Sequence, residues 1–189
     1  DSVSGTDADT YYMGLTATSF VNLNDNFSNV TFDVTDGYII INPITDKVTV
    51  TIIGTNDTSV YDGTMHTVEH YTWSADNDLY VREFFTFAGT ESASRKDVGT
   101  TMMELDGKLS DDTLKFKNAT VNFTDVVFDI TDGYQTITER KISFTAKSET
   151  KTYNGTEQSI NTVEIGELKL ANNHTTNVTF LAKGTEVGN

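Results

Sequence analysis

The sequence repeats itself, and an internal repeat limits the possible folds of a chain more than any other feature does. Residues 32–38 read FDVTDGY and residues 128–134 read FDITDGY, which places the two heptapeptides 96 positions apart. A second pair, YDGT from Tyr61 and YNGT from Tyr153, lies 92 positions apart. The two offsets predict a module of about 95 residues whose loops differ in length between its copies.

Alternation of apolar and polar residues marks the segment around each heptapeptide. Residues 30–34 read VTFDV and residues 126–130 read VVFDI. A period of two is typical of a β-strand with one buried face, and β-branched and aromatic residues favour strands. We therefore predict an all-β fold of two tandem, small β-sandwich modules of the immunoglobulin-like kind, with β-grasp-like modules as the alternative.

Glycine-containing turns are predicted at the ends of these strands. Asp-Gly is a favoured pair for a two-residue hairpin turn, because a type I′ turn requires positive φ at both central residues. Such turns would connect residues 30–34 to residues 38–41, and residues 126–130 to residues 134–137. The predicted turn residues are Asp36, Gly37, Asp132, Gly133, Gly63 and Gly155.

The repeat can be divided into modules in two ways. The first division places one module at 1–92 and a second at 93–189. The second division gives a half repeat at 1–44, a complete repeat at 45–139 and a half repeat at 140–189. In that case the front half of one chain would complete the back half of the next, as a head-to-tail filament. We favour the first division, because it needs no partner to bury the apolar faces.

Charge and cysteine content exclude several classes of function. The chain carries 28 acidic and 13 basic side chains, a formal net charge of −15, which disfavours nucleic acid and anionic membranes as partners. It contains no cysteine, so disulfides, thiolate nucleophiles and cysteine-ligated zinc are excluded. No apolar run approaches the roughly 18 residues of a membrane span, and no secretion signal or sorting tail is evident. We expect a mature or excised fragment that does not insert into membranes.

Acidic pairs are the candidates for a metal site. Asp76 with Asp78, and Asp7 with Asp9, offer the carboxylate oxygens that Ca²⁺ prefers. Neither pair has the spacing of an EF-hand loop, and aspartate is also frequent in turns. We therefore expect no cofactor, and calcium at these four residues remains the alternative.

Two aromatic residues are candidates for binding a sugar ring. Tyr71 and Trp73 are two positions apart and would share one face of a strand. Core packing is the alternative role for such rings, and we favour it. The sequence shows no glycine-rich phosphate loop, no serine nucleophile elbow and no basic aromatic platform, so catalysis is not expected.

The chain resembles a known class of bacterial surface repeat. Residues 5–15 (GTDADTYYMGL), 26–32 (NFSNVTF) and 35–38 (TDGY) resemble the tandem repeats of large surface proteins from gut Firmicutes. Residues 48–52 (VTVTI), followed by 60–64 (VYDGT), are similar to MBG-type adhesin modules. The resemblance implies a secreted, cell-surface, non-catalytic protein that acts as an adhesin stalk, a spacer or a filament-forming segment.

The expected partners follow from that resemblance and from the repeat. They are neighbouring repeats of the same protein, and another copy of the chain in head-to-tail self-assembly. The alternative function is a module that binds carbohydrate or a host glycoprotein through Tyr71 and Trp73.

Overall fold

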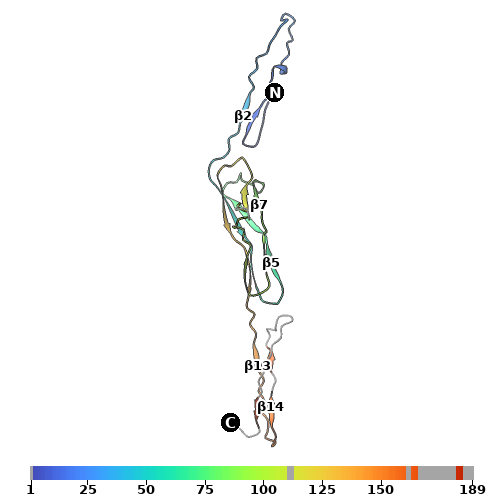
Figure 1. Cartoon of the computed structure of the whole chain (residues 1–189), viewed down its shortest axis with the longest axis vertical. Coiled ribbons are helices and arrows are strands. Elements are labelled where there is room, and N and C mark those ends of the chain that lie inside the picture. The colour runs from blue at the N-terminus through green and yellow to red at the C-terminus, as the bar shows by residue number, and fades with distance from the viewer. Residues whose placement is uncertain (1, 110–112, 161–162, 166–181, 185–189) are drawn as a thin grey trace. The chain divides into compact units, whose positions relative to one another are not determined.

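The structure, a computed structural model, describes residues 2–109, 113–160, 163–165 and 182–184. In these residues the chain is all-β with almost no helix, and its strands form several small sheets (Figure 1). No helix in the described part is long and apolar enough to cross a bilayer. The chain forms two compact units, one of residues 1–52, 73–89 and 106–131, the other of residues 53–72, 90–105 and 132–189.

The first unit contains three sheets. Strands β1 and β2 pair antiparallel with Tyr12 opposite Tyr38, and β7 pairs antiparallel with β10. Strand β3 lies between β11 and β6 in a three-stranded sheet, and β3 and β6 each continue into the second unit. The elements are β1 (Thr10–Tyr12), η1 (Ala17–Ser19), β2 (Tyr38–Ile40), β3 (Val48–Gly54), β6 (Tyr71–Ala75), η2 (Arg82–Phe84), β7 (Phe85–Phe87), β10 (Phe116–Asn118) and β11 (Val126–Thr131).

The second unit is built around a parallel strand pair. Strand β12 lies between β4, which runs parallel to it, and β9, which runs antiparallel. Three further antiparallel pairs are β5 with β8, β13 with β15, and β14 with β16. The elements are β4 (Asn56–Val60), β5 (His66–Glu69), β8 (Ser92–Arg95), β9 (Gly99–Met102), β12 (Tyr134–Thr138), β13 (Phe144–Ala146), β14 (Gln158–Ile160), β15 (Val163–Ile165) and β16 (Ala182–Gly184).

Buried apolar side chains are confined to the middle of the described chain. Strand β3 shows why: Val48, Val50 and Ile52 are buried and alternate with threonines, as a strand with one core face requires. Every buried apolar side chain of the described residues lies between positions 48 and 137. They are Val48, Val50, Ile52, Val68, Tyr80, Phe85, Ala93, Met103, Leu105, Phe116, Phe123 and Ile137.

The Asp-Gly segments do not form the predicted hairpins. Strand β12 pairs with β4 and β9 and not with β11, and neither Gly37 nor Gly133 has positive φ. Glycine is needed at 133 for another reason: a Cβ there would lie 2.6 Å from the carbonyl oxygen of Thr55. The Asp-Gly pair favours a turn, but contacts with segments distant in sequence determine which strands pair.

The aspartates of the two Asp-Gly segments accept backbone hydrogen bonds from a segment that is distant in sequence. Asp132 accepts hydrogen bonds from the backbone N–H groups of Glu104 at 2.8 Å and Leu105 at 2.9 Å. Asp36 accepts the equivalent bonds from Gly14 at 3.0 Å and Leu15 at 2.9 Å. Each aspartate therefore closes a connection between two strands that are distant in sequence.

Strand pairing also bears on the predicted modules. Strand β5 pairs with β8, and β7 with β10, so paired strands lie on both sides of position 92/93. Neither compact unit ends there. In the described residues two strand pairs thus cross the boundary of the first division, modules at 1–92 and 93–189, which stays a prediction.

Candidate functional site

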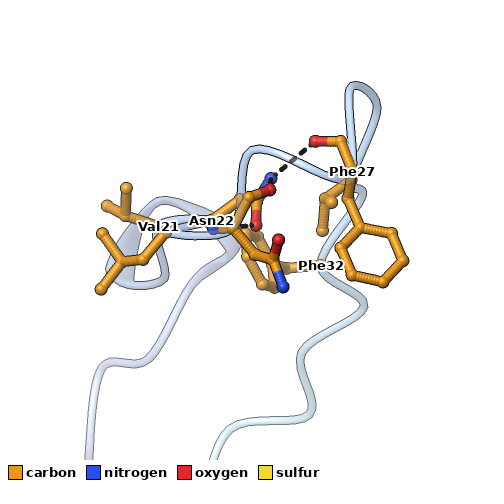
Figure 2. Close-up of a pocket in the computed structure, with 7 residues that line it drawn as sticks. Val21, Asn22, Phe27 and Phe32 are labelled. Atoms are coloured by element: carbon orange, nitrogen blue, oxygen red, sulfur yellow. Dashed lines mark hydrogen bonds between the residues drawn. The ribbon is translucent and has the colours of Figure 1, made fainter.

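An open apolar pocket of about 500 Å³ lies in the loop that connects β1 to β2 (Figure 2). Asn22 holds the loop together, because its Nδ2 donates to the carbonyl oxygens of Phe27 at 2.8 Å and Asn24 at 3.3 Å. Leu23 is 92% exposed and Phe27 61% exposed, so the lining faces solvent. The lining residues are Val21, Asn22, Leu23, Asn24, Phe27, Val30 and Phe32.

The same loop structure occurs a second time, 96 positions later. Asn118 takes the place of Asn22, and its Nδ2 donates to the carbonyl oxygens of Phe123 at 2.9 Å and Thr120 at 3.1 Å. The backbone N–H of Thr120 donates to Asn118 Oδ1, as that of Asn24 does to Asn22 Oδ1. The two loops therefore have matching internal hydrogen bonds.

Burial distinguishes the two loops. The rings of Phe20 and Phe32 lie 5.7 Å apart at 32°, and those of Phe116 and Phe128 lie 5.7 Å apart at 32°. Yet Phe20 is 42% exposed, whereas Phe116 is 2% exposed. The two loops therefore have matching internal geometry, but the loop with Phe116 is buried and the loop with Phe20 is exposed to solvent.

The cover of the second loop comes from residues 80–85. The Tyr80 hydroxyl donates to Asn118 Oδ1 at 3.1 Å, and the Tyr80 ring lies edge-on to Phe123 at 5.2 Å. Burial raises the pKa of Tyr80. Phe85 packs against Phe116 with 6.1 Å between ring centroids. Phe123 is consequently 3% exposed, against 61% for its counterpart Phe27.

Strand β2, which follows the pocket loop in sequence, has an open edge among the described residues. Its counterpart β12 has β9 on one side and β4 on the other, with Tyr134 opposite both Met102 and Asn56. Among the described strands β2 pairs only with β1. Its three residues are 44 to 59% exposed, whereas Gln135 in β12 is 0% exposed.

A second repeated structure is the turn around Gly63 and Gly155. Asp62 Oδ1 accepts hydrogen bonds from the N–H of Thr64 at 2.8 Å and from its hydroxyl at 2.7 Å. Asn154 Oδ1 does the same for Thr156, at 3.0 and 2.8 Å. Gly63 and Gly155 have positive φ values of 82° and 77°. This match agrees with the 92-residue offset between YDGT and YNGT.

Asp62 should titrate at unusually low pH. The hydroxyl and N–H of Thr64, followed by His66, stabilise the carboxylate and lower its pKa from 3.8 to about 2. Because the folded pKa is the lower one, the carboxylate stabilises the fold above the unfolded pKa, and this contribution is lost as pH falls from 3.8 towards 2. An NMR titration should show the low pKa. Asp62→Asn should keep the turn, as Asn154 does, and an ordinary aspartate pKa in the wild type would contradict the assignment.

The segment after β12 is exposed throughout. Every residue from 141 to 157 is exposed, and residues 147–157 belong to no strand. Phe144 is 45% exposed, whereas its counterpart Ile52 is 0% exposed. Residues 148–152 correspond to β4, and among the described strands they have no neighbour equivalent to β12.

The aromatic candidates lie in strand β6. Trp73 packs edge-on against the buried ring of Phe85, with centroids 5.5 Å apart, and both Trp73 and Tyr71 are half-buried. The contact with Phe85 is the core-packing role that we favoured for Trp73.

Three of the four acidic candidates accept hydrogen bonds from groups of the protein itself. Asp76 accepts the N–H of Thr49 at 2.9 Å, Asp9 accepts the N–H of Thr10 at 2.7 Å, and Asp7 accepts Asn122 Nδ2 at 2.8 Å. In the described part of the chain no three acidic or histidine side chains are grouped so that they could hold a metal ion. Asp78 is therefore not brought into such a group.

No family model, no curated protein and no solved structure matches this chain.

The pocket and the open edge of β2 were missed by the sequence analysis. The repeat contained a usable signal, since Phe27 aligns with Phe123 and Ile39 with Gln135 at an offset of 96. Only the structure shows that one member of each pair is covered and the other is exposed.

Proposed function

We propose that this chain is a non-catalytic repeat segment of a secreted, cell-surface protein, in which tandem small β-sandwich modules of about 95 residues serve as an adhesin stalk or spacer. The observation that carries the proposal is the recurrence of side-chain geometry at matched positions. Asp36 and Asp132 close equivalent strand connections. Asn22 and Asn118 hold equivalent loops.

The repeated carboxylate and amide side chains stabilise loops and turns. The carboxylates and amides bond to backbone groups of their own loop or turn, which satisfies donors and acceptors that would otherwise be unpaired. Each repeat adds one module with the same loops and turns. Modules joined in series form an array whose length increases with the number of copies. The net charge of −15 would keep such an array soluble and separated from anionic surfaces.

Small-angle X-ray scattering on concatenated copies tests the spacer function. Proteins with one, two and four copies of the chain joined in series should increase in maximum dimension by a constant increment per copy. The control is the same series unfolded in urea, whose maximum dimension should not increase by a constant increment per copy. A maximum dimension that levels off, as in a collapsed globule, would contradict a spacer.

A glycan array addresses the binding alternative on the same protein. A spacer should show no saturable binding to any glycan. Saturable binding that Tyr71→Ala abolishes, with the circular dichroism spectrum unchanged, would replace the spacer function by carbohydrate recognition.

A further inference from the structure

The strand pairs of the repeated module fall into two groups. The front half, residues 48–95, and the back half, residues 99–138, each contain internal pairs. All three of these recur: β9–β12 as β1–β2, β5–β8 as β14–β16, and β3–β6 as β13–β15. The pairs between halves are β4–β12, β3–β11 and β7–β10, and none of them recurs in the described residues. Segments 30–42 and 141–152 keep their pairs within a half, β1–β2 and β13–β15, but in the described residues they lack the pairs between halves, and they are therefore complementary.

We propose that residues 30–42 bind residues 141–152 of a second copy of this chain, which adds a parallel strand to β2, so that copies join head to tail. The inference rests on the repeated module of the proposed function. It goes beyond it by naming the partner and the register.

The register follows from the complete module. There β4 runs parallel to β12 with Tyr134 opposite Asn56 and Thr136 opposite Thr58. Thr136 corresponds to Ile40 at the offset of 96, and Thr58 corresponds to Thr150 at the offset of 92. The proposed register therefore places Ile40 opposite Thr150 of the second copy. Addition of a strand to an open sheet edge is a common mode of peptide recognition, in which main-chain hydrogen bonds provide affinity.

Apolar surface on both segments would be covered by this arrangement. In the first segment Ile39 is 44% exposed and Ile40 52% exposed. In the second, Ile142 is 37% exposed and Phe144 45% exposed, although their counterparts in β3 are fully buried. Exposed apolar residues on a strand edge are a known site for association with another chain.

Charge favours a second copy over an unrelated acidic partner. Residues 30–42 contain two aspartates and no lysine, arginine or histidine. Residues 141–152 contain three lysines and one glutamate, in a chain with only 13 basic residues. The two segments that must meet therefore carry opposite charge, which favours and orients their association.

One position differs sterically between the complete module and the proposed contact. Gly54 lies against Gly133, where an added Cβ would be 2.6 Å from the Gly133 Cα. The counterpart of Gly54 is Ala146, whose methyl group would face Gly37 and hold the strands slightly apart. Ala146→Gly should therefore tighten the association by about threefold or more, and weakening by this substitution would overturn the register.

Site-directed cross-linking tests the register directly, because the native chain has no cysteine. Ile40→Cys and Thr150→Cys chains, both altered at exposed positions, are mixed and treated with a short bismaleimide. We expect a covalent heterodimer. The control mixture, Ile40→Cys with Ser143→Cys, moves the partner cysteine seven residues along the strand, by roughly 23 Å. Equal yields from both mixtures would overturn the proposed pairing.

Light scattering tests the association itself. The wild-type chain should form concentration-dependent, head-to-tail oligomers, and Lys147→Glu should weaken them by about tenfold at low salt, with a smaller effect in 0.5 M salt at a Debye length of roughly 4 Å. Circular dichroism confirms that the variant keeps its fold. A chain that stays monomeric at all concentrations overturns this inference. The spacer function would still stand if concatenated copies lengthened regularly, so the two failures are distinguishable.

Discussion

Replacing Phe116 with alanine should lower the free energy of unfolding by about 3 to 5 kcal/mol. Phe116 is 2% exposed, and its ring contacts those of Phe85, Phe87 and Phe128 at centroid distances of 4.5 to 6.1 Å. Truncation removes these contacts and leaves a cavity that the surrounding rings can fill only in part. Urea unfolding followed by tryptophan fluorescence measures the change, since Trp73 also packs on Phe85.

The matched control is Phe20→Ala in the uncovered loop. Phe20 contacts Phe32 with the same ring geometry but is 42% exposed, so its loss should cost less than about 1 kcal/mol at a concentration where the chain is monomeric. Equal losses for the two variants would show that the loop around Phe20 is covered in the monomer, contrary to its exposure in the structure.

Asp132→Ala should lower the free energy of unfolding by about 2 kcal/mol. The carboxylate accepts the N–H groups of Glu104 and Leu105, and Leu105 is fully buried, so its N–H would lose its partner. Hydrogen bonds to charged groups contribute about 1.5 to 3 kcal/mol, and an unsatisfied buried donor costs about as much. Thermal unfolding by circular dichroism measures the change.

Two variants define what Asp132 contributes. Asp132→Asn keeps one acceptor oxygen and should recover about half of the loss. Asp36→Ala removes the equivalent bonds to Gly14 and Leu15, in a part of the chain with no buried side chain, and should change global stability less. A larger loss for Asp36→Ala than for Asp132→Ala would contradict the placement of the stable core between positions 48 and 137.

Local patterns predicted much of the secondary structure. The alternation in residues 126–130 forms strand β11, and the glycines of the YDG and YNG turns have positive φ. The same alternation at residues 30–34 forms no strand, although the sequence is nearly identical. A strand needs a neighbour for its backbone hydrogen bonds, and β11 has β3 beside it.

The sequence by itself determined the all-β class, the repeat with its two offsets, and the turns at Gly63 and Gly155. These depend on side-chain periodicity and on backbone preferences that act within a few residues. Only the tertiary structure decided that β12 pairs with β4 and not with β11, and that Phe116 is buried while Phe20 is exposed. Burial and strand pairing depend on which distant segment lies alongside, and two copies of one local sequence can differ completely in that respect.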